Sequence, residues 1–210
     1  MLVALALLAA PLRAQGDADR AALDRIDATV RDFDRRGLPT DLLRAKVAEG
    51  TAKGASQVRI ADAVVLLAAR VDSVARLLAP TVSVPELHAG AEALSVGISA
   101  PALRIIRTAA GRQSAEPYFL FVIRLVRRGV THEQAVRATR SLIERQVAAS
   151  TLLAVADDLA RDVASGMAPD AALNDRLTRL VGGAGAAGVT GTADGPRGPG
   201  VGQLSGSKPP

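Results

Sequence analysis

The chain has 210 residues, a formal net charge of +5, no cysteine and only four aromatic side chains, three Phe and one Tyr. Because it has no cysteine, disulfides, a thiol nucleophile and lipid attachment through an N-terminal cysteine are excluded. Alanine, leucine and arginine, which are good helix formers, are abundant, and this composition favours an all-α fold.

The N-terminus has the pattern of an export signal. Residues 2–12 are almost wholly apolar, and Ala14 is a small residue of the kind that precedes a signal-peptidase cut. The apolar run is much shorter than the roughly 20 residues that span a bilayer. We therefore predict a signal peptide over residues 1–14, cleavage before Gln15 and a periplasmic or extracellular location. The alternative is a membrane tether through an uncleaved N-terminal segment, and the missing positive charge before the apolar run departs from both patterns.

Helical periodicity is clearest in residues 57–78, where apolar residues recur every three or four positions and charged residues occupy the other faces. Similar patterns between turn residues predict further helices. The predicted helices cover residues 20–36, 41–53, 57–78, 85–96, 101–109, 117–128, 132–149, 152–165 and 169–181.

A recurring pattern separates these segments: a glycine, then in most cases a larger apolar residue, then a turn or capping residue. Glycine just past a helix adopts the left-handed conformation at little cost, and a following Ser or Thr accepts an amide hydrogen bond from the next helix. Thr131 with Gln134 fits the capping box. We therefore expect five glycines to be helix C-caps at which the chain reverses: Gly37, Gly54, Gly97, Gly129 and Gly166.

These glycines are spaced by 17, 43, 32 and 37 residues, which is too uneven for a strict solenoid. The tryptophan-containing signature of tetratricopeptide repeats is also missing, because the chain has no Trp. The predicted fold is an all-α domain over residues 15–181, either an irregular bundle or a degenerate array of short helical hairpins. Residues 182–210, with 10 Gly and 4 Pro, are predicted to form a disordered Gly-rich tail.

The segment 117–128 brings aromatic and basic residues together. It is apolar nearly all round up to Val126 apart from Arg124, which is typical of a central buried helix, although a strand is an alternative. Aromatic and arginine side chains together also suit an anionic polymer or a membrane headgroup zone. The stronger interpretation is a buried aromatic core followed by arginines at the negative end of the helix dipole. The candidate anion- or membrane-binding residues are Tyr118, Phe119, Phe121, Arg124, Arg127 and Arg128.

The sequence offers little catalytic or metal-binding chemistry. His88 and Glu92, four residues apart, share one helix face, but a metal site needs further ligands, and His132 is distant in sequence. No HExxH, GxSxG or phosphate-loop pattern occurs, and SxxK is absent from residues 15–181. We therefore expect no catalytic residues, no metal and no cofactor.

The positive charge is concentrated in residues 101–150, which hold 9 basic and 3 acidic residues, whereas residues 15–100 hold 11 and 12. An exported protein rarely meets nucleic acid, so anionic lipid or wall polymer is the better candidate for a charged ligand. The basic residues of this region are Arg104, Arg107, Arg112, Arg124, Arg127, Arg128, Arg137, Arg140 and Arg145.

The Ala- and Arg-rich composition is similar to that of exported proteins from bacteria with GC-rich genomes. The sequence therefore favours an interaction or scaffold protein of the bacterial cell envelope that binds a protein partner, and it leaves the oligomeric state open. One alternative is a binder of anionic polymer or membrane surface through the basic region 101–150. A second is a hydrolase without a familiar motif, for which a pocket would have to gather His88 or His132 with two carboxylates.

Overall fold

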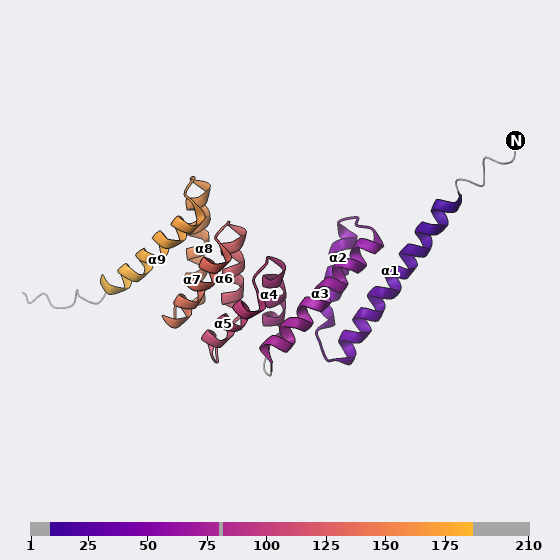
Figure 1. Cartoon of the computed structure of the whole chain (residues 1–210), viewed down its shortest axis with the longest axis horizontal. Coiled ribbons are helices and arrows are strands. Elements are labelled where there is room, and N and C mark those ends of the chain that lie inside the picture. The colour runs from indigo at the N-terminus through magenta and orange to yellow at the C-terminus, as the bar shows by residue number, and fades with distance from the viewer. Residues whose placement is uncertain (1–8, 80–81, 187–210) are drawn as a thin grey trace, which may run out of the picture.

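The computed structural model describes residues 9–79 and 82–186, and within them the chain forms nine α-helices and no strand (Figure 1). The all-α prediction is confirmed. Residues 1–8 of the predicted signal peptide and the predicted tail from residue 187 onward lie outside the described residues. The helices are α1 (Ala9–Arg35), α2 (Thr40–Ala52), α3 (Gln57–Leu78), α4 (Val84–Ser95), α5 (Ala100–Ala110), α6 (Glu116–Arg127), α7 (His132–Glu144), α8 (Ala149–Ala164) and α9 (Pro169–Ala186).

Four helix boundaries differ from the sequence prediction by three residues or more, and one of them is the start of α8, at Ala149 instead of residue 152. Helix α1 begins at Ala9, inside the predicted signal peptide, so the predicted cleavage point before Gln15 falls within a continuous helix. Helix α7 ends at Glu144 instead of residue 149, because Gln146 adopts a positive φ of 56° and reverses the chain there. Helix α9 runs to Ala186, beyond the expected boundary at 181, since glycine weakens a helix without blocking it.

All five glycines predicted as C-caps have positive φ angles, which are 66°, 66°, 90°, 88° and 99° in chain order. The hydrogen bonds at Gly129 show the motif. The Gly129 amide donates to the Val126 carbonyl at 2.9 Å, and the Val130 amide donates to the Leu125 carbonyl at 3.2 Å. This pair of bonds is the Schellman motif, and it satisfies carbonyls that the end of the helix would leave unpaired. The same pair of bonds recurs at the other four glycines and at Gln146.

The predicted details around the glycines hold only in part. Ile98 and Val130, which follow two of them, are buried, but Met167 is 40% exposed. The predicted capping box of Thr131 and Gln134 is wrong, because the Thr131 side chain makes no capping hydrogen bond. Gln134 instead donates its side-chain amide to the Asp170 carbonyl at 3.0 Å, in α9, so a tertiary contact displaces the local one.

The helices form an array of hairpins. Four hairpins, α2–α3, α4–α5, α6–α7 and α8–α9, turn at Gly54, Gly97, Gly129 and Gly166, and these four tips lie along one edge of an elongated molecule (Figure 1). In the odd-numbered layer α1 packs on α3, α3 on α5 and α5 on α7, while in the even-numbered layer α4 packs on α6 and α6 on α8. Packing between each helix and the one two places later is the arrangement of an α-solenoid.

Neighbouring tips stack on one another. A Cβ placed on Gly97 would lie 2.9 Å from Nε2 of His132, and a Cβ placed on Gly129 would lie 3.2 Å from Cγ of Pro169. His132 and Pro169 each stand three residues after the glycine of their own tip. The His132 Nε2 also lies 3.0 Å from the Val96 carbonyl oxygen, to which an Nε2–H donates. Glycine at positions 97 and 129 therefore has two roles: it allows the positive φ of the turn, and it leaves space for a side chain of the next hairpin.

The even-numbered layer is interrupted between α2 and α4, which do not pack closely against each other. Both helices pack on α3 instead, and α3, with 22 residues, is nearly twice as long as either. A Cβ on Gly50 of α2 would lie 2.7 Å from Ile60, near the start of α3. A Cβ on Gly90 of α4 would lie 2.7 Å from Val74, near the end of α3. The two helices therefore cross α3 at widely separated points.

A buried carboxylate, Glu86, joins α4 to the start of α6. Glu86 is only 4% exposed and forms the capping box of α4 with Ser83. Its Oε1 accepts a hydrogen bond of 2.7 Å from the Ala115 amide, and the Arg107 guanidinium lies 3.7 Å away. Burial alone would raise the pKa of Glu86. The hydrogen bonds from Ser83 and Ala115 and the charge of Arg107 outweigh burial and hold this pKa below its ordinary value of 4.5.

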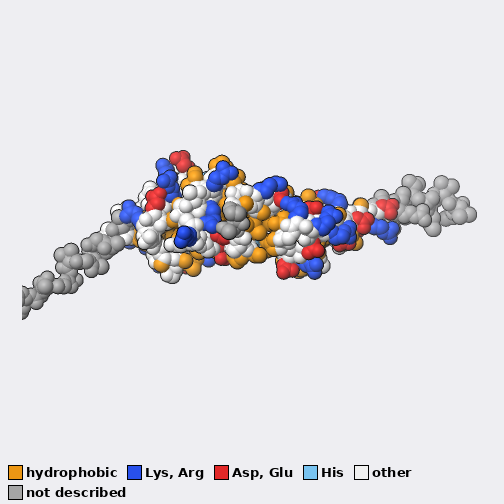
Figure 2. All heavy atoms as spheres, turned by 90° about the horizontal axis from the view of Figure 1, so that it is seen from below, with side chains coloured by type: hydrophobic (Ala, Val, Ile, Leu, Met, Phe, Trp, Pro, Cys, Tyr) orange, Lys and Arg blue, Asp and Glu red, His pale blue; other side chains and the backbone are white. Residues whose placement is uncertain are grey.

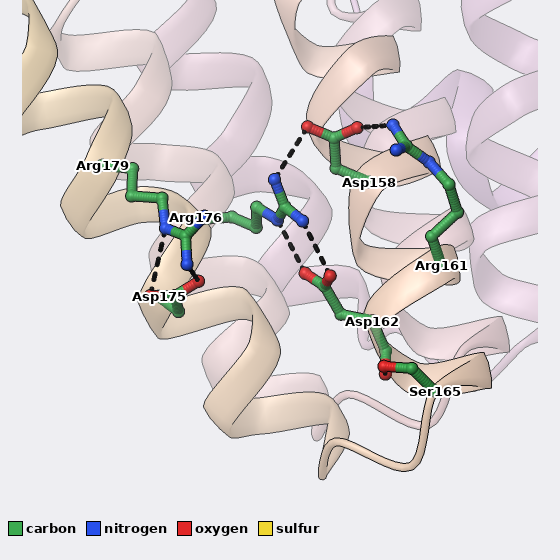
Figure 3. Close-up of polar contacts among 7 residues, drawn as sticks. All are labelled: Asp158, Arg161, Asp162, Ser165, Asp175, Arg176 and Arg179. Atoms are coloured by element: carbon green, nitrogen blue, oxygen red, sulfur yellow. Dashed lines mark hydrogen bonds and ion pairs between the residues drawn. The ribbon is translucent and has the colours of Figure 1, made fainter.

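An ion-pair network ties α9 to α8 (Figure 3). The Arg176 guanidinium donates from Nε and Nη2 to the two carboxylate oxygens of Asp162, at 2.6 and 2.7 Å, and from Nη1 to Asp158 at 3.1 Å. The hydrogen bonds from Arg176 lower the pKa of Asp162. Arg176 is largely shielded from solvent, so this bidentate pair orients the last hairpin more firmly than an exposed ion pair would.

We predict that Gly129→Val lowers the free energy of unfolding by more than about 1 kcal/mol, because a β-branched residue resists the left-handed backbone and its Cβ meets Pro169. Chemical denaturation measures the change. Gly16→Val is the control, since Gly16 lies in a helix with no atom near its missing Cβ. Equal stability of the two variants would contradict the assigned turn.

We predict that Glu86→Gln lowers the free energy of unfolding by about 1–3 kcal/mol at neutral pH, because it weakens the hydrogen bonds from the Ser83 and Ala115 amides and leaves Arg107 without its counter-charge. Since the folded-state pKa is depressed, the carboxylate stabilises the fold above its ordinary pKa, and this contribution disappears as the pH falls through the folded-state value. The difference between wild type and Glu86→Gln should therefore shrink in urea titrations below about pH 4. Glu133→Gln, at an exposed ion pair, should change little at any pH.

Candidate binding groove

The interruption in the even-numbered layer leaves a groove of about 660 Å³ between α2 and α4, which we call the α2–α4 groove. Its floor is one stripe of α3, made of four residues at helical spacing: Ala63, Leu66, Leu67 and Arg70. Helix α6 contributes Arg127. The walls are Leu42, Ala45, Lys46 and Glu49 of α2, and His88, Ala91, Glu92 and Ser95 of α4.

The floor of the groove is apolar and accessible. The core stripe of α3, which includes Val64 and Val71, is fully buried, whereas Leu66 on the groove stripe is 51% exposed. A large apolar side chain at the bottom of a hollow lined by two helices is typical of a surface that receives a partner. The groove is therefore the best-formed candidate binding site among the described residues.

The charges on the walls are mostly satisfied within the groove. Glu92 pairs with Arg127 at 2.7 Å, and Glu49 pairs with Lys46 at 2.9 Å and with Lys53 at 2.5 Å. The hydrogen bonds from Lys53 and Lys46 lower the pKa of Glu49 to about 2. Arg70 differs, because no carboxylate among the described residues lies within ion-pair distance of its guanidinium.

The groove gathers His88 with two carboxylates, Glu49 and Glu92, which is the arrangement that the hydrolase alternative requires. The state of those carboxylates argues against acid–base work. A carboxyl group with a pKa of about 2 is a poor proton donor or acceptor near neutral pH, and the Glu92 carboxyl group already forms an ion pair with Arg127. Within residues 9–79 and 82–186, no three His, Asp or Glu side chains come together as a metal site. His132 lies elsewhere, at the α4–α5 tip.

The aromatic half of the candidate anion-binding cluster is not at the surface. Phe119 and Phe121 are fully buried and Tyr118 is 5% exposed, with its hydroxyl donating to Gln113 Oε1 at 3.0 Å. The interpretation of a surface that combines these aromatics with arginine is therefore corrected, since α6 packs on α4, α7 and α8 and needs the aromatics in the core. The segment is a helix and not a strand.

The arginines of the cluster point to different partners. Arg124 lies 3.6 Å from Asp157 of α8, Arg127 belongs to the α2–α4 groove, and Arg128 is exposed. These three arginines of α6 and its C-terminus therefore do not share one partner or one site.

The basic region as a whole is also divided. Five of its nine arginines form ion pairs, namely Arg107, Arg124, Arg127, Arg137 and Arg140. Of the other four, Arg104 lies within α5 and Arg128 follows the end of α6, at the edge of the hairpin tips. Arg112 and Arg145 follow the ends of α5 and α7, at the opposite edge. On the face drawn in Figure 2, basic side chains are spread along the molecule between acidic and hydrophobic ones. None of the described helices is long and apolar enough to cross a bilayer.

Comparison with known protein families, with curated proteins and with solved structures gives no match to this chain. The candidate site therefore rests on its own geometry. Sequence analysis singled out His88 together with Glu92, and Arg127 separately from them, and it missed Leu66 and Arg70. The sequence does contain a second stripe on α3, at positions 63, 66, 67 and 70. It does not show which stripes of a helix are buried by neighbouring helices and which are left accessible.

We predict that the purified protein binds anionic liposomes weakly at low ionic strength and releases them at physiological salt, because few unpaired arginines share one face. Co-sedimentation at increasing salt measures this. Saturable binding that persists at physiological salt, and that Arg112→Glu or Arg145→Glu weakens, would instead support the anion-binding alternative.

Proposed function

We propose that the protein is an exported interaction or scaffold protein of the bacterial cell envelope, and that its α2–α4 groove binds a segment of a protein partner. The observation that carries this proposal is the interruption of the even-numbered layer, which leaves the apolar stripe of α3 accessible between two helical walls. Extended arrays of helical hairpins offer binding surfaces of this kind.

The envelope location in this proposal depends on the N-terminal sequence. The apolar run and the small residue at Ala14 support export. A groove with an apolar floor and satisfied carboxylates supports binding more than catalysis, because binding needs shape and buried area whereas acid–base chemistry needs groups that exchange protons near neutral pH.

Site-specific photo-crosslinking in the native host tests the proposal. A photoreactive amino acid at position 66 should give discrete adducts with a partner protein in the envelope fraction. The matched control is position 153, because Leu153 of α8 is 42% exposed, also apolar, and lies outside the groove.

The expected result is a set of adducts from position 66 that position 153 does not give. The adducts should disappear when Ala45→Trp is combined with the crosslinker, because a bulky side chain on this exposed wall residue fills the groove. The same adducts from both positions, or adducts only in the cytoplasmic fraction, would contradict the proposal.

A further inference from the structure

The α2–α4 groove has the width of one helix. Its walls approach α3 at Ile60 and at Val74, which are 14 residues and therefore roughly 21 Å apart along the axis of α3. That separation is about twice the 8–10 Å between the axes of two packed helices. A single helix placed between the walls would therefore pack against both α2 and α4.

The chemistry of the floor favours a helix over an extended peptide. Each residue of an extended segment brings an amide and a carbonyl that need hydrogen-bond partners. The floor offers only the side chains of Ala63, Leu66 and Leu67 before Arg70, and the described residues contain no strand whose edge could pair with a peptide. A helix satisfies its own backbone and presents an apolar stripe, which is what this floor accepts.

The Arg70 guanidinium favours a ligand that carries a negative charge. Arg70 ends the floor stripe, it is partly buried, and its groove neighbours Glu49 and Glu92 are already paired with Lys46 and Arg127. A partly buried guanidinium without a carboxylate is stabilised by a partner that supplies one. Arg70 lies one turn of α3 beyond Leu66 and Leu67. A ligand helix that pairs with Arg70 should therefore carry its acidic residue about one turn away from the apolar residues that contact Leu66 and Leu67.

We infer that the groove receives an amphipathic α-helix of a partner protein, with apolar side chains one turn apart resting on Leu66 and Leu67 and an acidic side chain paired with Arg70. This inference rests on the proposed function and specifies its ligand. The bound helix completes the even-numbered layer between α2 and α4.

The test is a selection with a phage-displayed library of helical peptides. The peptides have about 16 residues, long enough to be helical in water, with one face randomised on an alanine-rich background. The full-length protein is the target. The selected peptides should carry apolar residues spaced by three or four positions and an acidic residue one turn away. Leu66→Asp should abolish their binding, and Arg70→Glu should weaken it by at least about tenfold.

The matched control is Arg44→Glu, an equal change of charge on α2 at an exposed position outside the groove, which should leave binding unchanged. A second selection against Arg70→Glu should return Lys or Arg in place of the acidic residue. Peptides that depend on Leu66 but show no preference for an acidic residue, or that tolerate Arg70→Glu, would overturn this inference and leave the proposed function standing. A selection that yields no peptide sensitive to Leu66→Asp would contradict both.

Discussion

The path of this chain depends on one backbone constraint, a single residue with positive φ just past the end of a helix. At Gly129 this conformation lets the Gly129 and Val130 amides satisfy two carbonyls of α6. It also reverses the chain within three residues and leaves room for Pro169 of the next hairpin. Because the same device acts at the other tips, successive helices return antiparallel and bury their apolar stripes against one another. The array has no disulfide to fix it, so the turns and the packing must do so.

The groove forms because the helices of this hairpin array differ in length. Helix α3 is longer than α2, and α4 packs against the C-terminal part of α3. There the missing side chain of Gly90 lets α4 approach Val74 closely. Beyond this point α4, α6 and α8 are in regular contact, and Glu86 joins α4 to the start of α6. The opening in the even-numbered layer is therefore also the place where Leu66 is exposed and where Arg70 has no carboxylate partner among the described residues.

Much of the fold could be predicted from the sequence, because helix periodicity and glycine reversals are local. The end of α7 was missed since Gln146 is not a residue type that signals a left-handed backbone. The capping box at Thr131 failed because Asp170, distant in sequence, supplies a better partner for Gln134. The groove could not be predicted for a related reason: it depends on which helices pack side by side, and that is decided by tertiary contacts such as Gly90 on Val74.

Helices α4, α6 and α8 stack regularly, and the stack breaks between α2 and α4. Distances between pairs of spin labels measure this break, and the chain has no native cysteine to interfere with labelling. One pair, at positions 45 and 88, spans the groove, and the other, at positions 124 and 157, joins the packed helices α6 and α8. We expect a clearly longer distance across the groove than between α6 and α8. Equal and short distances for both pairs would mean that the even-numbered layer is continuous and that there is no groove.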